Sequence, residues 1–157
     1  MRRIDFKSAK IDEVDIEILT QCEKQEHATR NSVFEKSEWL PKQHNKEIVY
    51  ERIKKLIEYY LIVEDDLQTY SLSEVEVGYL GGFRNTQLSE IVLHQVDPRI
   101  FGSVSVLTSI NSPEGATIAL ATDTGTILCE GIVKIGSVHY QITEVGRMQG
   151  SLISRPR

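Results

Sequence analysis

The sequence predicts an α+β fold in which three helices and a β-hairpin precede a small, mainly antiparallel β domain, either a barrel or a sandwich. Two observations predict it. Up to about Gly82, charged residues are dense and apolar residues recur at helical spacing. Beyond it, Val, Ile, Thr and Ser dominate, and turn residues recur about every ten positions. We therefore expect a flexible basic arm over residues 1–9, a helical domain over 10–82 and a β-rich domain over 83–157.

The first helix is expected to begin after Ile11. Asp12 is a suitable N-cap, and Glu13 and Asp15 place negative charge at the positive end of the helix dipole. The apolar stripe that would bury one face of this segment consists of Ile11, Ile18, Leu19 and Cys22.

A second, short helix is predicted to follow. Ser32 and Glu35 are spaced as in a capping box, in which each side chain satisfies a backbone N–H group of the first turn. Pro41 disfavours helical geometry in the residue before it, so this helix should end by Leu40. The large aromatic residues expected in the core here are Phe34 and Trp39.

The third helix has the most regular pattern in the chain. Asn45 can cap it, and its apolar residues step by four, three and four positions. They are Val49, Ile53, Leu56 and Tyr60. Two strand-like runs follow, over residues 61–63 and 68–72, on either side of the acidic turn Glu64-Asp65-Asp66. They predict a β-hairpin, and three helices followed by a hairpin is the order of a winged helix.

Four strands are expected in the C-terminal half, over residues 104–108, 116–122, 126–134 and 138–143. Turn residues separate them at 111–115, 123–125 and 135–137. Apolar residues alternate with small or polar ones within these strands, which indicates that one face is buried. A helix over residues 87–94 is expected to connect the two domains.

Composition and charge exclude several classes of protein. No apolar run approaches the ~18 residues of a membrane span, and no apolar segment follows the charged N-terminus as in a secretory signal. We therefore expect a cytoplasmic protein. The 18 Lys and Arg against 23 Asp and Glu, a net charge of −5, argue against strong non-specific affinity for DNA, which rests on cations that neutralise phosphates.

Neither a metal site nor an enzyme active site is predicted. Cys22 and Cys129 occupy apolar positions and are expected as buried thiols. The histidines share no metal-ligand spacing with them or with one another. The glycines near Gly81 lack the Lys-Ser or Lys-Thr of a phosphate loop, and no Ser lies in a nucleophile elbow. We expect a protein that is not an enzyme and uses no cofactor.

The helical half resembles a known superfamily. The pattern Ile11-Asp12-x-x-Asp15-x-x-Ile18-Leu19 resembles the start of Lrp/AsnC-type regulators. The run from Val49 to Leu56, followed by Leu61-Ile62 and Tyr70-Ser71-Leu72-Ser73, is similar to the recognition helix and wing of winged helix-turn-helix proteins. The resemblance covers residues 10 to 80 and implies a DNA-binding protein that regulates transcription. The β-rich half does not resemble the Lrp/AsnC ligand domain.

One position departs from the superfamily pattern. Members usually place Gly just before the Leu-Ile pair, where the helix ends in a left-handed residue, and this chain has Tyr60 there. A residue other than Gly in that conformation costs ~1–2 kcal/mol. Either the helix ends differently in this protein, or Tyr60 is needed for packing.

The candidate nucleic-acid contact lies at the third helix. If Val49, Ile53 and Leu56 face the core, the outward positions and the residues before the helix would meet the major groove and backbone of double-stranded DNA. These candidate contact residues are Lys42, Gln43, His44, Asn45, Lys46, Tyr50 and Lys54. Glu47 and Glu51 share the outward face and argue against DNA.

The acidic wing at Glu64-Asp65-Asp66 raises the same objection, because it would repel phosphates at short range. Either it points away from nucleic acid or the domain binds something basic. Two main hypotheses follow. The first is a DNA-binding transcription regulator whose β domain mediates homodimerisation or senses a ligand. The alternative is a winged-helix adaptor that binds protein without contacting DNA. A third, a small enzyme that uses the β domain, has no supporting motif.

Overall fold

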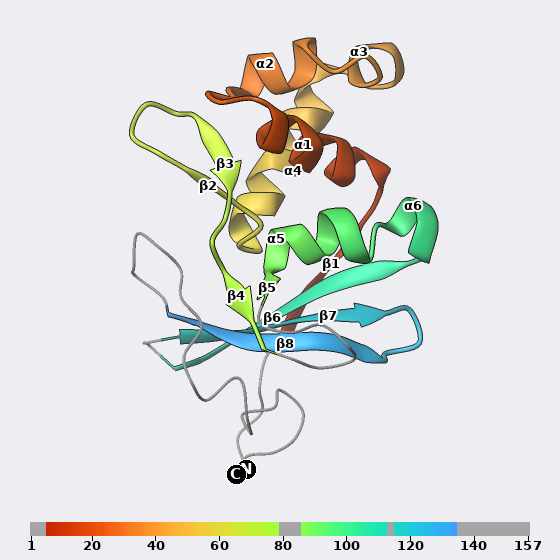
Figure 1. Cartoon of the computed structure of the whole chain (residues 1–157), viewed down its shortest axis with the longest axis vertical. Coiled ribbons are helices and arrows are strands. Elements are labelled where there is room, and N and C mark those ends of the chain that lie inside the picture. The colour runs from red at the N-terminus through yellow and green to blue at the C-terminus, as the bar shows by residue number, and fades with distance from the viewer. Residues whose placement is uncertain (1–5, 79–85, 113–114, 135–157) are drawn as a thin grey trace.

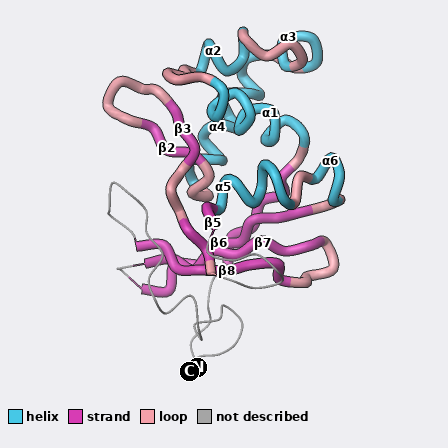
Figure 2. The backbone as a smooth tube through the Cα atoms, viewed as in Figure 1, coloured by secondary structure: helices cyan, strands magenta, loops and turns pink. Residues whose placement is uncertain are grey.

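The computed structural model describes residues 6–78, 86–112 and 115–134 of the chain. They form a mixed α+β fold. Four helices and a hairpin make up one end of the molecule, and an antiparallel sheet makes up the other (Figure 1). The described helices all lie on one side of that sheet (Figure 2).

Two of the predicted helix starts are confirmed. Helix α1 (Glu13–Lys24) is capped by Asp12, whose side chain accepts the N–H groups of Val14 and Asp15 at 3.1 and 3.2 Å. The Asp15 carboxylate in turn accepts the N–H of Asp12 at 3.0 Å, which completes a capping box. Helix α4 (Lys46–Glu58) is capped by Asn45, whose side-chain oxygen accepts the N–H of Ile48 at 3.1 Å.

The prediction for the second helix is wrong in its start, although the helix does end before Leu40. Helix α2 (Arg30–Glu35) is capped by Thr29, which shares a capping box with Ser32 inside the helix. The chain leaves helical geometry after Glu35, and a separate short helix, α3 (Leu40–Gln43), carries Pro41 in its first turn. Proline is well suited to that position because the N–H it lacks would have no partner within the helix.

The apolar stripe of α4 packs as the spacing predicts. Val49, Ile53 and Leu56 are at most 1% exposed and belong to one core cluster with Ile18 and Leu19 of α1. Both thiols are also buried. Phe34 lies in the same cluster, and Trp39 packs against it while partly exposed. The cluster continues without interruption into the sheet, so the two halves share one hydrophobic core.

The end of α4 resolves the question raised by Tyr60. This residue has a left-handed φ of +66°. The N–H of Tyr60 donates to the carbonyl of Ile57 at 3.1 Å, and the N–H of Leu61 donates to that of Leu56 at 2.8 Å. These two bonds make a Schellman motif, the usual helix end at which Gly is preferred. Tyr60 therefore adopts a conformation that is strained for a residue other than Gly, and its ring packs against the core.

The expected hairpin is present. Strands β2 (Ile62–Glu64) and β3 (Tyr70–Leu72) pair antiparallel, with Val63 opposite Ser71. A backbone bond from the N–H of Tyr70 to the carbonyl of Ala28 at 2.7 Å ties the hairpin to the segment between α1 and α2. The hairpin projects beside the helices (Figure 1).

The antiparallel strands expected in the C-terminal half are confirmed as far as the structure describes them. Strands β6 (Val104–Ser112), β7 (Gly115–Thr122) and β8 (Ile127–Lys134) follow one another in an antiparallel sheet. The tip between β7 and β8 closes at Gly125, which has a φ of +91°. Strand β6 extends through Ser112, into the turn expected over 111–115, and residues 138–143 lie outside the described part of the chain.

The N-terminal arm is the largest difference from expectation. Residues 6–9, expected to be flexible, belong to strand β1 (Phe6–Ile11), which pairs along its whole length with β6. The sheet order is β1-β6-β7-β8, so these four strands form one open sheet, and there is no closed barrel among the described strands. Helices α1 to α4 and the β2–β3 hairpin, which we call the helical unit, are therefore inserted in sequence between two neighbouring strands of a single sheet. Residues 1–5 lie outside the described part.

A helical connection close to residues 87–94 is confirmed. It consists of α5 (Leu88–Glu90) and the wider π-helical turn η1 (Ile91–Gln95), whose buried residues fill the space between α1 and the sheet. A short hairpin of β4 (Glu76–Val77) and β5 (Thr86–Gln87) precedes it, and α6 (Pro98–Phe101) follows it. Within the described ranges, each helix is too short or too polar to cross a bilayer.

Candidate functional site

The predicted contact residues, apart from Lys54 farther along α4, lie around the start of that helix. Lys42 and Gln43 end α3, His44 and Asn45 join it to α4, and the remaining three lie on α4. The exposed members of this set are Lys42, Gln43, Asn45, Lys46 and Lys54, whereas His44 and Tyr50 are partly buried. The structure therefore brings most of the set together but does not expose all of it.

Three members of the set are already engaged within the protein. The side chain of Asn45 caps α4, as described above. The ring of His44 lies edge-on to that of Trp39, with centroids 5.3 Å apart. The hydroxyl of Tyr50 donates to the side chain of Asn31 on α2, and the guanidinium of Arg30 lies 4.8 Å from the centre of the Tyr50 ring. Tyr50 faces α2 rather than an incoming ligand.

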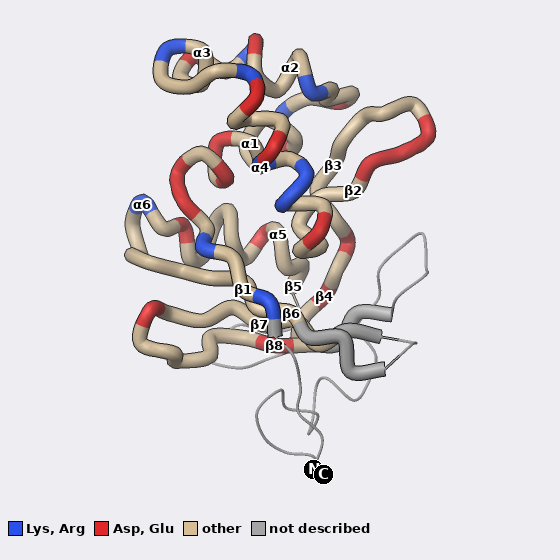
Figure 3. Tube along the Cα trace, turned by 180° about the vertical axis from the view of Figure 1, so that it is seen from behind, with Lys and Arg blue, Asp and Glu red and all other residues tan. Residues whose placement is uncertain are grey.

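The outward face of α4 is more acidic than basic. At about 100° per residue, the positions opposite the Val49–Ile53 stripe are Glu47, Glu51, Lys54 and Glu58. All four are exposed. Lys46 flanks this face, and Lys7 of β1 forms an exposed ion pair with Glu58. In Figure 3 the basic segments of the helical unit are scattered among acidic and uncharged ones.

Two cations of α4 outside the predicted set define the strongest electrostatic feature of the helical unit. The Nζ of Lys55 lies 2.7 Å from the Oδ2 of Asp15, and the Nη1 of Arg52 lies 3.4 Å from its Oδ1. Arg52 also contacts Asp12 at 2.6 Å. Lys55 donates in addition to the carbonyl of Lys10 at 3.0 Å. We call these two acids and two cations the α1–α4 ion cluster.

Burial sets the electrostatics of the ion cluster. Asp15 has no exposed surface, and this burial raises its pKa, an effect that the Lys55 ammonium opposes. Burial also tends to raise the pKa of Asp12. The Arg52 guanidinium and the Asp15 N–H outweigh this effect and hold that pKa below its ordinary value. The sequence signal for this cluster is the matched spacing of three in Asp12-x-x-Asp15 and Arg52-x-x-Lys55. That spacing puts each pair on one helix face.

The acidic tip of the hairpin has a structural part and an exposed part. The Asp65 carboxylate accepts the N–H groups of Leu67 and Thr69, both at 2.9 Å, and so holds the turn in shape. The hydroxyl of Thr69 hydrogen-bonds to this carboxylate and, with the backbone, lowers the pKa of Asp65. Glu64 and Asp66 remain as exposed charges. Leu67 projects from the same loop with 82% of its surface exposed.

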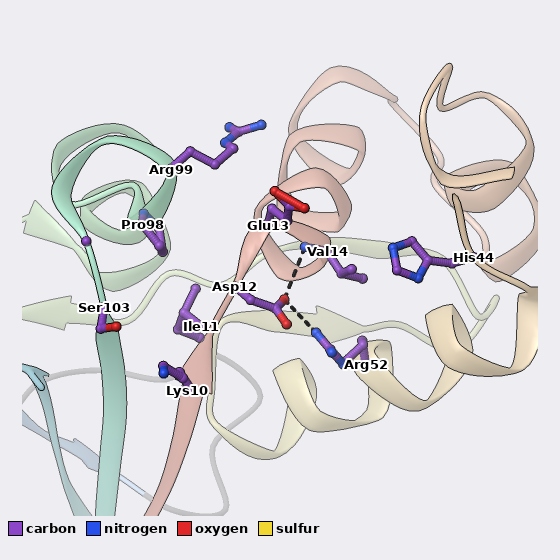
Figure 4. A pocket seen from close by; sticks show the side chains of 11 residues that line it. Lys10, Ile11, Asp12, Glu13, Val14, His44, Arg52, Pro98, Arg99 and Ser103 are labelled. Atoms are coloured by element: carbon purple, nitrogen blue, oxygen red, sulfur yellow. Dashed lines mark hydrogen bonds and ion pairs between the residues drawn. The ribbon is translucent and has the colours of Figure 1, made fainter. Parts of the chain in front are cut away.

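A groove of about 530 Å³ lies where the helical unit meets β1 and α6 (Figure 4). Arg99 enters it from α6, and Arg52 and His44 lie on the opposite side. Both arginines already face carboxylates, Arg52 with Asp12 and Arg99 with Asp97 at 2.8 Å. Lys10 and Glu13 also line the groove, with charges of opposite sign, so the groove presents no excess of one charge to an ionic ligand.

Within the described residues, no three His, Cys, Asp or Glu side chains come close enough together to hold a metal ion. Comparisons with family models, curated proteins and solved structures found no match to this chain.

Proposed function

We propose that the helix–hairpin unit is a protein-interaction adaptor whose acidic α4–hairpin surface binds a basic segment of a partner protein. The observation that carries this proposal is that two of the cations on α4 are already paired with acids of the same chain. Arg52 and Lys55 are neutralised within the α1–α4 ion cluster. Glu58 is likewise paired, with Lys7. Besides Asp65, which holds the hairpin turn, the exposed charges of α4 and the hairpin that remain are the four acids Glu47, Glu51, Glu64 and Asp66 against the two cations Lys46 and Lys54.

Charge complementarity supports a cationic partner. Phosphates approaching α4 would meet exposed carboxylates within about one Debye length, roughly 10 Å at 0.1 M salt, and would be repelled. A Lys- or Arg-rich segment would be attracted over the same range. Such attraction mainly increases the association rate and excludes wrongly charged partners, while apolar contacts supply affinity. Leu67, 82% exposed beside the acidic tip, is suited to one such contact.

A second candidate, a DNA-binding transcription regulator, is favoured by a different observation. Lys42, Gln43 and Lys46 are exposed around the amino end of α4, a helix of 13 residues whose dipole favours anions there. In this case the lysines, including Lys54, would contact phosphates, and the sheet would serve dimerisation or ligand sensing.

Fluorescence anisotropy on the full chain separates these candidates. We expect a labelled peptide of repeated Gly-Ser-Arg units to bind, and to bind more weakly as salt rises from about 50 to 200 mM. A labelled DNA duplex of mixed sequence should not bind. The double variant Glu47→Gln and Glu51→Gln should lose peptide affinity severalfold, since an exposed ion pair contributes at most about 1 kcal/mol.

The matched control is Glu90→Gln, which removes an exposed carboxylate from α5, outside the α4–hairpin surface. It should leave peptide binding unchanged. Duplex binding that weakens steeply with salt and is lost in Lys42→Ala and Lys46→Ala would overturn the adaptor proposal in favour of the DNA-binding candidate.

A further inference from the structure

A second cleft, of about 270 Å³, lies between the start of α2 and the hairpin. Thr29, Arg30 and Asn31 form one wall, and the other wall comes from the hairpin. The hairpin residues that line it are Glu64, Leu67, Gln68 and Tyr70. Most of this lining is polar, and the volume suits one long side chain rather than a separate small molecule.

We infer that this cleft is the subsite that receives an arginine side chain of the basic partner segment, an inference that rests on the proposed function. Glu64 supplies the counter-charge, and a carboxylate can accept two parallel hydrogen bonds from a guanidinium. The side-chain oxygen of Gln68 adds an acceptor on the hairpin wall. On the opposite wall, the oxygen of Asn31 already accepts from the Tyr50 hydroxyl and keeps one further lone pair. Several acceptors around one narrow cleft match the planar fork of arginine better than the single point charge of lysine.

The hairpin wall of the cleft is held in shape before any partner binds. Gln68 has a left-handed φ of +61°, and its N–H donates to the carbonyl of Asp65 at 3.0 Å. The Asp65 carboxylate fixes the residues on either side of Gln68, as described above. The hairpin is in turn tied to the α1–α2 segment through Tyr70 and Ala28. Binding would therefore require little ordering of this loop.

Tyr70 fixes the counter-charge. Its hydroxyl donates to the Oε2 of Glu64 at 3.1 Å, and burial together with this bond raises the pKa of Tyr70 to about 12. The hydroxyl therefore remains a donor at neutral pH and orients the carboxylate. An ionised carboxylate accepts up to about four hydrogen bonds, so Glu64 keeps capacity for a guanidinium.

Arg30 is the cation that lines the cleft, and it provides an internal check. Its guanidinium lies 4.8 Å from the centre of the Tyr50 ring on α4, and its charge also acts on the Tyr70 hydroxyl in the cleft, where it opposes the larger effects of burial and Glu64 on the pKa of Tyr70. With Asp65 and Asp66 next to Glu64 in the loop, the acids near the cleft outnumber this one cation. Removing the charge of Arg30 should strengthen the binding of an arginine.

The test uses the full chain and three labelled peptides that differ only in the repeated residue, Gly-Ser-Arg, Gly-Ser-Lys or Gly-Ser-citrulline. Citrulline keeps the shape of arginine and lacks its charge. We expect the arginine peptide to bind several times more tightly than the lysine peptide and at least about tenfold more tightly than the citrulline peptide. Glu64→Gln should bring the arginine and lysine affinities to within about twofold, and Arg30→Gln should tighten arginine binding.

Glu47→Gln is the matched control, because it removes one carboxylate from α4 and none from the cleft. It should weaken the arginine and lysine peptides alike and leave their ratio unchanged. In an NMR titration of the wild-type chain, the side-chain amides of Asn31 and Gln68 should shift with the arginine peptide. Basic peptides that bind while Glu64→Gln leaves the arginine preference intact would overturn this inference alone. A failure of every basic peptide to bind would overturn the proposed function as well.

Discussion

The Nζ of Lys55 on α4 lies 2.7 Å from the Oδ2 of Asp15 on α1, a carboxylate with no exposed surface. Asp15 also belongs to the capping box of α1, so this ion pair joins the start of α1 to α4. It orients α4 against α1 and removes a cation from the exposed face.

The first prediction concerns this pair. Lys55→Met should lower the free energy of unfolding by about 3 kcal/mol, because it leaves a buried carboxylate with only the Asp12 N–H and the longer contact to Arg52. Urea denaturation followed by circular dichroism measures the change. In the double variant with Asp15→Asn the loss should be smaller than the sum of the two single losses, since both partners of the charge interaction are then gone.

Lys54→Met is the matched control for Lys55→Met. It makes the same substitution one position away, at an exposed site, and should change the free energy of unfolding by less than about 0.5 kcal/mol. Equal effects at the two positions would show that the buried ion pair contributes nothing specific.

The second prediction concerns the left-handed residue that ends α4. Tyr60→Ala and Tyr60→Gly both remove the ring that packs on the core, but only Gly adopts a φ of +66° without strain. Tyr60→Gly should therefore be more stable than Tyr60→Ala by about 1 kcal/mol. Thermal and urea denaturation of the two variants measure this difference directly.

The control for Tyr60 is the same pair of substitutions inside the helix. At Lys54, which is exposed in the last turns of α4, Ala should be more stable than Gly by about 1 kcal/mol. The order of Ala and Gly should thus reverse between positions 54 and 60. The same order at both would mean that the Schellman geometry at Tyr60 is wrong.

The third prediction concerns alkaline pH. Burial raises the pKa of Cys22 and of Cys129 from an ordinary value of 9.0 to about 12. Between these values the unfolded chain ionises its thiols and the folded chain does not. The associated stability is therefore fully present below pH 9 and is lost progressively as the pH rises toward 12. The free energy of unfolding, measured in urea, should fall across this window.

Removing the thiols tests the cause of that fall. The variant with Cys22→Ala and Cys129→Ala is less stable at neutral pH because of the cavities, but its stability should decline less steeply between pH 9 and 12. A thiol reagent at pH 8 should label the wild-type chain only after denaturant unfolds it. Rapid labelling of either cysteine in the folded chain would contradict the burial.

Much of the fold follows from local patterns in the sequence. The spacing of Val49, Ile53 and Leu56 determines the buried face of α4, because side chains three and four positions apart share one side of a helix. Asp12 and Asn45 define two helix starts, and the acidic turn with its flanking strands defines the hairpin. These signals depend on neighbours within a few residues, so no tertiary information is needed to interpret them.

The second helix shows where local patterns compete. Ser32 and Glu35 have capping-box spacing, yet Thr29 and Ser32 form a box one turn earlier. Both pairings are compatible with the sequence. The hydrogen bond from the Ser32 hydroxyl to Gln25 at 2.6 Å, a contact with the end of α1, accompanies the earlier start. That contact depends on how the two helices approach each other.

The candidate site was only partly predictable, for a related reason. The sequence determines that Lys42, Lys46 and Lys54 are exposed and that Glu47 and Glu51 share their helix, because periodicity alone assigns these positions to the outer face. It does not determine that Tyr50 bonds to Asn31, or that Arg52 and Lys55 pair with Asp12 and Asp15 some 40 residues away in the chain. Those pairings exist only when α4 packs across α1.

The pairing of β1 with β6 likewise depends on the tertiary structure. The sequence by itself determined the helical stripe, the hairpin and the strands of the C-terminal half, all of which are set by period and turn chemistry. Whether residues 6–11 remain free or join a strand that begins at Val104 depends on an unpaired strand edge. That edge belongs to β6, and pairing with it carries no signature in the residues of one strand alone.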